Sequence, residues 1–414
     1  MQQKFECSKP FLASMMAAAV FVLGGTTAIG AGAIPTPKVS QANADAFRDM
    51  GSAFAAKRYA EVDTKANGVL ASSQKTRDDT FTAYQYLMQT AAARNDVSGQ
   101  IKALEGQLDS GFLPQSAQAS YYRNLIGLAY KQPDYHKAID YGQQLIKMGD
   151  ASPEVYQWVG QAYYELKDYK SAVDFFNNLV TQKEKAGRKP DRNELILLQS
   201  SYLKAGNKDA ARATLQKVVK YYPDASTWQA LLHDVKTARL DKVQKLQLYR
   251  LMHATKNLQD YKDFMAYSDA ATAMGLLAES QQVLEDGLKA NVFPAGADRD
   301  RAERYRKSAI NMVAQRRAEL PALEAAAKSS ATGDEYIELG RVYMSFAQYD
   351  KAVAALQAGI AKGKLKNPAD ARMNLGLALL KSGQKAEALK AFRAADSSDD
   401  VTQRIAELWA LYAS

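Results

Sequence analysis

The chain has 414 residues, of which 47% are apolar and 24% are charged, and it carries a formal net charge of +9. This apolar share is sufficient for a buried core, and the lack of further long apolar runs excludes a polytopic membrane protein. Three histidines and one cysteine are too few for the usual zinc or iron–sulfur sites, so we expect neither a metal nor a cofactor.

The first segment, residues 1–33, has the pattern of a cleaved signal peptide. Two lysines precede an apolar run at residues 11–23, and Ala31-Gly32-Ala33 supplies the small residues that signal peptidase requires. We therefore expect export and cleavage after Ala33, with Ala42-Asn43-Ala44 as an alternative site. A retained membrane anchor is the other interpretation, which the short apolar run disfavours. Because Cys7 precedes the run, the exported chain would contain no thiol.

The rest of the chain has the spacing of short helices joined by tight turns. A first pair of helices is predicted at residues 45–72. Its recurring positions are Gly51, Phe54, Tyr59 and Val62. Residues 78–109 predict a second pair that turns at Asn95-Asp96, but this pair lacks the glycine and tyrosine positions of the others.

The spacing is clearest in the hairpin that begins at residue 156. A glycine in its first helix is followed by aromatic, small and apolar residues, namely Gly160, Tyr163, Tyr169, Ala172, Phe176 and Leu179. A glycine or alanine on each helix lets the two backbones approach closely, and aromatic residues fill the grooves beside them. The same positions recur as Gln199, Tyr202, Ala211 and Val218; as Gly340, Tyr343, Tyr349, Ala352 and Leu356; and as Gly376, Leu379, Ala388 and Phe392. With one residue missing at the turn, they also recur as Gly127, Tyr130, Tyr135, Ala138 and Leu145.

Weaker patterns separate these hairpins. The polar, basic residues 181–192 predict a loop between repeats. Two divergent hairpins are predicted at residues 228–251 and 268–287, and the second turns near Gly275. A break at residues 291–300 is the main predicted boundary of the chain.

Two further helices are predicted beyond this break and at the end of the sequence. Residues 299–317 form a basic helix whose arginines are interrupted by acidic residues, a pattern typical of a solvated helix face. The last helix places an apolar stripe on one face and would cap the final repeat. That stripe consists of Val401, Ile405, Leu408, Trp409 and Tyr412.

These recurring hairpins resemble tetratricopeptide repeats. The resemblance is clear at residues 120–223 and 334–395 and weaker at residues 45–72. Because each hairpin buries only one side, the resemblance implies hairpins stacked in series. We therefore predict an all-α helical-hairpin solenoid with a C-terminal capping helix, divided into an N-terminal array at residues 45–290 and a C-terminal array at residues 301–414.

The resemblance also implies a partner-binding groove, because the first helices of such repeats line an inner surface that holds an extended peptide or a partner helix. The candidate groove residues are Asn124, Leu128, Gln157, Gln161, Tyr164, Ile196, Ser200, Leu203, Ile337, Arg341, Met344, Met373, Leu377 and Leu380. Exposed apolar residues on such a surface predict a contact site. The alternative is that a neighbouring helix or the chain's own terminus covers them. No lysine–asparagine clamp for a terminal carboxylate is present, which disfavours a chaperone tail as the partner.

Catalysis is not expected, because the sequence has no nucleophile elbow, phosphate-binding loop or metalloprotease motif, and His136, His233 and His253 are isolated. We predict a non-catalytic protein-binding scaffold of the bacterial cell envelope, located in the periplasm, with no nucleic-acid partner. The alternative function is a component of an envelope machine for TonB-linked transport or polysaccharide export. That component would bind glycan, and the basic helix would favour an anionic one.

Overall fold

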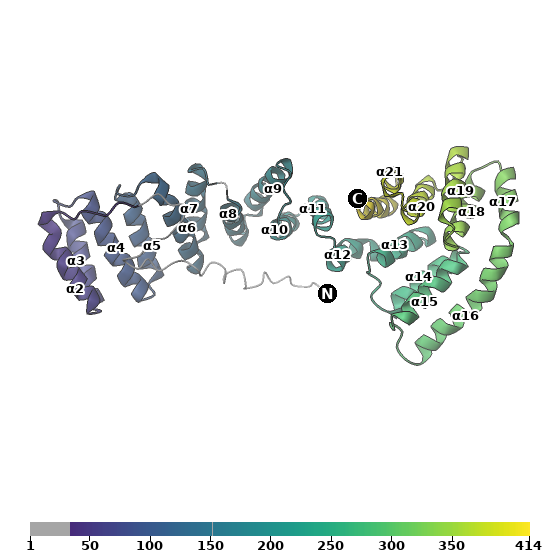
Figure 1. The fold of residues 1–414 in the computed structure, drawn as a ribbon, viewed down its shortest axis with the longest axis horizontal. Coiled ribbons are helices and arrows are strands. Elements are labelled where there is room, and N and C mark those ends of the chain that lie inside the picture. Colours follow the sequence, from purple (N-terminus) through teal and green to yellow (C-terminus); the bar gives the residue numbers. More distant parts are fainter. Residues whose placement is uncertain (1–33, 151) are drawn as a thin grey trace. The chain divides into compact units, whose positions relative to one another are not determined.

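The computed structural model describes residues 34–150 and 152–414, and within these ranges every regular element is a helix (Figure 1). The predicted all-α helical-hairpin fold is therefore confirmed. The predicted signal peptide lies outside the described residues. The chain separates into two units, the first ending at Ala211 and the second beginning at Arg212. The predicted arrays at residues 45–290 and 301–414 stay a prediction.

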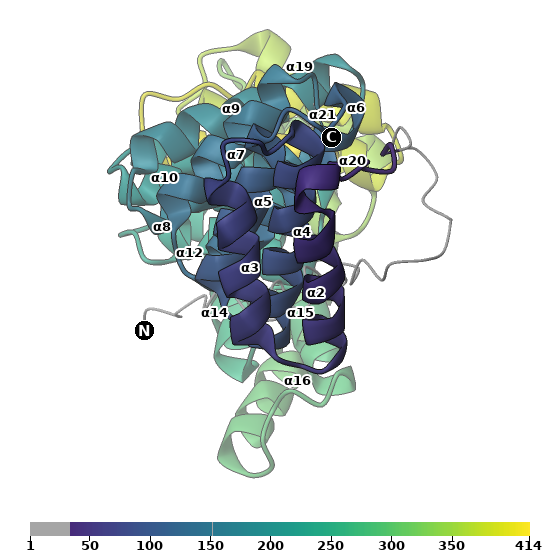
Figure 2. The same ribbon diagram turned by 90° about the vertical axis from the view of Figure 1, so that its left-hand side faces the viewer.

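The first unit is a series of helices in which each helix packs against the next along the chain. Figure 2 shows α2 and α3 side by side at one end of this series. After a short 3₁₀ helix at Gln41–Asn43, the helices are α2 (Ala44–Ala55), α3 (Tyr59–Ala71), α4 (Arg77–Ala93), α5 (Val97–Asp109), α6 (Gln115–Lys131), α7 (Tyr135–Lys147), α8 (Pro153–Glu165), α9 (Tyr169–Lys185) and α10 (Arg192–Lys204). The hairpins predicted at residues 45–72 and 78–109 are thus confirmed.

The loop predicted at residues 181–192 is shorter than expected, because α9 continues to Lys185. The cause is Lys183, whose side chain turns inward and is only 5% exposed. Its Nζ lies 2.5 Å from Asp191 Oδ2 and 2.7 Å from Glu194 Oε1. A polar segment that appeared to be a surface loop is therefore anchored to the start of α10 by a buried cation.

The close helix approach predicted from glycine holds at some repeats and not at others. A Cβ atom at Gly160 would lie 2.7 Å from the ring of Phe176, and one at Gly376 would lie 2.6 Å from the ring of Phe392. Only a residue without a side chain fits at these positions. At Gly127, by contrast, nothing lies within 4 Å of such an atom, so the helices there do not require glycine.

The second unit begins within α11 (Lys208–Tyr221). Its further helices are α12 (Ala225–Lys236), α13 (Lys242–Ala254), α14 (Tyr261–Ala273), α15 (Leu277–Lys289), α16 (Ala297–Ala318), α17 (Leu320–Ser329), α18 (Asp334–Ser345), α19 (Tyr349–Lys362), α20 (Pro368–Lys381), α21 (Lys385–Arg393) and α22 (Asp400–Ala413). The predicted turn near Gly275, the basic helix and the final helix are all present.

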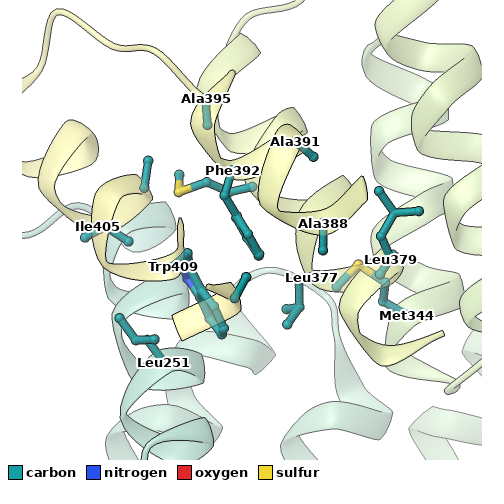
Figure 3. Packing of buried hydrophobic residues seen from close by; sticks show 14 of the residues in the cluster. Leu251, Met344, Leu377, Leu379, Ala388, Ala391, Phe392, Ala395, Ile405 and Trp409 are labelled. Carbon is teal, nitrogen blue, oxygen red and sulfur yellow. The ribbon is translucent and has the colours of Figure 1, made fainter. Parts of the chain in front are cut away.

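The final helix does more than cap the last repeat. Besides packing on α20 and α21, α22 contacts α12 and α13 at the beginning of the second unit. Trp409 is fully buried and stacks on Phe392 with a ring separation of 5.5 Å, and Leu251 of α13 belongs to the same apolar cluster (Figure 3). The last helix of the second unit therefore returns to its first helices and shares an apolar cluster with them.

Candidate partner-binding surface

The candidate residues on α8 lie on the side of the helix that its core contacts leave accessible. Pro153 starts this helix, where its missing amide hydrogen costs nothing. Gln157, Gln161 and Tyr164 follow one another at helical spacing and are half-buried. Val159 and Ala162, on the other side, are fully buried. The two amides and the hydroxyl therefore remain partly accessible to a partner.

The candidate residues on α10 form a second accessible strip beside the first. Leu195 and Leu198 hold the helix in the core at 0% and 2% exposure. Ile196 and Leu203, in contrast, are 39% and 49% exposed, which is unusual for large apolar side chains. Ser200 lies between them at helical spacing, so the three side chains share one side of α10.

A hydrogen bond joins the two strips. The hydroxyl groups of Tyr164 and Ser200 lie 2.8 Å apart and link α8 to α10. The structure thus brings together the predicted residues of these two helices in one neutral surface. We call this surface the α8–α10 surface, and it consists of Gln157, Gln161, Tyr164, Ile196, Ser200 and Leu203.

The two candidate groove residues on α6 differ in their accessibility. Asn124 is half-buried and keeps an accessible side, as expected for a groove residue. Leu128, however, is 7% exposed and packs into the apolar core of the first unit together with Leu125 and Tyr130. The expectation that Leu128 faces a partner is corrected, because its side chain is buried where the helices pack together.

The candidates in the second unit do not form an open groove. Ile337, Met344, Met373 and Leu377 are each less than 9% exposed and belong to the apolar core of that unit, and the half-buried Leu380 packs against it. This burial is a correction to the predicted partner groove. Ile337 packs against Gly359 of its own hairpin. The alternative, cover by the chain's own terminus, applies to α20, because α22 packs against this helix.

Arg341 is likewise engaged within the second unit. Its guanidinium pairs with Asp370 and lies 3.8 Å from Glu338. Asp370 is 1% exposed, so the pair is largely shielded from water. A partner would have to replace an existing ion pair in order to bind Arg341.

Sequence reasoning missed a buried polar network centred on α13. Arg250 Nε and Nη2 each donate to a carboxylate oxygen of Glu279 at 2.6 Å, and Arg250 Nη1 donates to Asn374 Oδ1 at 2.8 Å. Gln247 Nε2 donates to Asp370 Oδ1 at 2.9 Å. These contacts join helices α13, α15 and α20. The one signal in the sequence was a set of polar residues within an otherwise apolar helix, and it did not reveal the partners.

Electrostatics keep this network ionised. Burial would raise the pKa of Glu279, but the guanidinium of Arg250 and the hydrogen bond from the Tyr267 hydroxyl outweigh burial, so this pKa lies below its ordinary value. Burial and the neighbouring Glu279 carboxylate raise the pKa of Tyr267 well above its ordinary value. The core of the network is therefore an ion pair between Arg250 and Glu279 that is largely shielded from solvent.

The described residues contain no group of three or more histidine, cysteine, aspartate or glutamate side chains arranged to hold a metal ion. None of the helices in the described ranges is both long enough and apolar enough to cross a membrane.

Comparison with known proteins agrees with the repeat pattern. Tetratricopeptide-repeat family models match residues 125–187, 200–225 and 337–401. The chain therefore contains tetratricopeptide repeats at these residues. Repeats of this family form protein-binding scaffolds, and the chain is a scaffold in this general sense. A comparison with curated protein sequences finds no match.

Solved structures resemble the chain only distantly. A tetratricopeptide repeat protein from Parabacteroides merdae is 10% identical, with 80% of this chain and 98% of that one covered and a TM-score of 0.29. A structure of Naa15/Naa10 bound to HypK-THB is 14% identical, with 87% and 65% covered and a TM-score of 0.32. The TPR2AB domain of yeast Sti1 in complex with pHSP90 is 14% identical, with 72% and 99% covered and a TM-score of 0.25. At these values the structures do not inform the function of this chain.

Proposed function

We propose that the chain is a non-catalytic scaffold that binds a segment of another protein on its α8–α10 surface. The observation that carries this proposal is the pair of exposed apolar side chains, Ile196 and Leu203, beside the hydrogen-bonded Tyr164 and Ser200. Large apolar side chains exposed next to convergent polar groups are typical of a contact site.

The chemistry of this surface favours an uncharged, extended segment of the partner. The amides of Gln157 and Gln161 both donate and accept hydrogen bonds, so they suit the N–H and C=O groups of a peptide backbone. Ile196 and Leu203 suit apolar side chains of the same segment. The surface contains no lysine or arginine, so it offers no ion pair to a terminal carboxylate or a phosphate.

The surface does not favour catalysis. Amides, an aliphatic pair and two hydroxyl groups bonded to each other supply no general acid or base near neutral pH. We therefore propose binding without turnover.

We further propose that the protein works in the periplasm of the bacterial cell envelope. This proposal rests on the export pattern of residues 1–33, and a retained membrane anchor is the alternative. A role in an envelope machine for TonB-linked transport or polysaccharide export is the second candidate function. It is favoured by the combination of Tyr164 with two glutamine amides, because an aromatic face and amide groups also suit a sugar ring.

The test is capture of a partner by matched variants of the chain expressed with residues 1–33. Ile196→Ser with Leu203→Ser changes the proposed surface, and Ile310→Ser with Met312→Ser makes the same chemical change at exposed positions on α16. Chemical cross-linking in cells, followed by purification and mass spectrometry, should recover a protein with the wild type and the α16 variant, and at least tenfold less with the α10 variant. Equal recovery with the α10 variant would contradict the proposal.

The same preparation tests the remaining proposals. N-terminal sequencing of protein from the periplasmic fraction should begin at Ile34, and protein found only with membranes at full length would support the anchor instead. Binding of envelope polysaccharide that is lost in Tyr164→Ala, without any captured protein, would favour the glycan alternative.

A further inference from the structure

The inner side of the last repeats in the second unit is occupied by another helix of the same chain. Helices α18 and α20 are the first helices of these repeats and lie in contact. Their inward side chains form a surface that we call the C-terminal groove, which consists of Arg341, Asp370, Met373, Asn374 and Leu377. Side chains of helix α13 reach this groove and bond to α20, across more than a hundred residues of the chain.

One face of α13 makes all of these contacts. Gln247 donates to Asp370 and to Asn374 Oδ1 at 3.1 Å, and Arg250 donates to the same Asn374 oxygen. Leu251, one residue further, is fully buried in the apolar cluster that contains Leu377 (Figure 3). A glutamine, an arginine three residues later and a leucine after that lie on one side of a helix. The face thus has a polar half and an apolar half that match the groove.

The groove is specific for such a face, because its polar groups have few other partners. With α13 in place, Asp370 and Asn374 are 1% and 0% exposed, so the groups that α13 supplies take the place of water as their partners. Within the groove, Asn374 Nδ2 donates to Asp370 Oδ2 at 2.9 Å, which leaves Asn374 Oδ1 and Asp370 Oδ1 directed at α13. Two aligned acceptors beside apolar side chains define the donor pattern that a bound helix must present.

We propose that the C-terminal groove is a helix-binding surface in which α13 is an internal ligand. A partner helix with the same pattern, glutamine followed by arginine at the third and leucine at the fourth position after it, competes with α13 for this groove. This inference concerns a different surface from the α8–α10 surface and does not depend on the function proposed there.

The tether makes α13 a strong competitor. A segment of the same chain acts at an effective concentration of the order of 1 mM, so a free helix of equal intrinsic affinity present at about 10 µM occupies roughly one groove in a hundred. The groove of the native chain is therefore closed to such partners. Weakening the contacts of α13 would open it.

The test uses the full chain and a fluorescent synthetic peptide with the sequence of residues 241–256, which contains α13. Gln247→Glu in the protein places a carboxylate against Asp370 and should loosen the internal helix. Gln229→Glu makes the same charge change at an exposed position on the neighbouring α12 and is the matched control. Fluorescence anisotropy at about 10 µM peptide should show at least tenfold more bound peptide for Gln247→Glu than for the wild type or Gln229→Glu.

Two results would overturn the proposal. One is binding of the peptide by the wild type as strongly as by Gln247→Glu, and the other is a helical Gln247→Glu protein, by circular dichroism, that binds no peptide. If Gln247→Glu does not fold, Gln247→Ala replaces it, because this change removes two hydrogen bonds without adding a charge. A folded Gln247→Ala protein should bind severalfold more peptide than the wild type, and equal binding would refute the internal ligand.

Discussion

Arg250→Met tests the buried network of the second unit most sharply. The native pair is bidentate, and the side chains of Arg250 and Glu279 are 3% and 16% exposed. Methionine fills much of the space but leaves the Glu279 carboxylate with the Tyr267 hydroxyl as its remaining side-chain donor. Breaking a buried ion pair by removing one partner costs about 3–5 kcal/mol, because a charge remains in the core without compensation. Arg393→Met, an exposed change on α21, should cost less than about 0.5 kcal/mol.

The stability of the wild type and that of Arg250→Met should change with pH in opposite directions. In the wild type the pKa of Glu279 is lowered, so the pair contributes stability above the unfolded pKa of about 4.3 and loses it as the pH falls below that value. In Arg250→Met, burial without the guanidinium raises the folded pKa above the unfolded one. The folded variant then binds a proton more readily than the unfolded chain, so the variant gains stability as the pH falls from 7 towards 5.

The assay is urea unfolding followed by tryptophan fluorescence. The chain has three tryptophans, and Trp158→Phe in all variants leaves Trp228 and Trp409, which are both buried in the second unit. The reasoning would be refuted by a cost below about 1 kcal/mol for Arg250→Met, or by a variant that loses stability on mild acidification.

Four further substitutions have defined outcomes. Gly160→Leu should destabilise the first unit by about 1–3 kcal/mol, because the leucine side chain would overlap the Phe176 ring, whereas Gly127→Ala should be neutral or stabilise its helix by up to about 1 kcal/mol. Urea unfolding followed by Trp158 fluorescence compares the two variants. Equal effects would contradict the close helix approach assigned to Gly160. Lys183→Met should cost about 3 kcal/mol in the same assay, since Glu194 stays buried without its cation, and an unchanged midpoint would mean that this ion pair is dispensable. Trp409→Ala should cost about 3–5 kcal/mol and expose α13 to hydrogen exchange, and protection of α13 equal to that of the wild type would contradict the closure of the second unit by α22.

The hairpins could be predicted from the sequence because their determinants are local. Gly160 and Phe176 contact each other within one hairpin, and the distance along the chain between such positions is fixed by helix geometry. The same spacing therefore identifies Gly376 and Phe392. Gly127 belongs to a hairpin that fits the pattern with one residue missing at the turn, and there the close contact is absent.

The groove of the second unit could not be predicted because its covering helix is distant in the sequence. Gln247 bonds to Asp370 across 123 residues, and no spacing rule connects them. Met373 and Leu377 have the positions of groove residues within their own repeat. In the folded chain they are buried in an apolar cluster that also contains residues of α13 and α22. The α8–α10 surface was easier to predict, because Tyr164 and Ser200 lie at corresponding places in consecutive repeats and meet without a third element.

The export prediction rests on the sequence pattern alone. Its evidence lies in residues 1–33, outside the described residues, and the alternative cleavage site at residues 42–44 falls where the structure begins its first helices. There, Asn43 is 8% exposed and donates a hydrogen bond to Asp79 at 3.1 Å. Cleavage at that site would remove a folded contact, which supports Ala33 as the proposed site.

Site-specific photo-cross-linking in living cells tests the central claim most directly. A benzophenone amino acid is placed singly at residue 196 or 203 on the α8–α10 surface, or at residue 310 on α16, all of which are exposed positions. The proposed scaffold predicts a discrete protein adduct from positions 196 and 203 and none from position 310. An adduct from position 310 alone, or the absence of any adduct from positions 196 and 203, would contradict a partner-binding surface on α8 and α10.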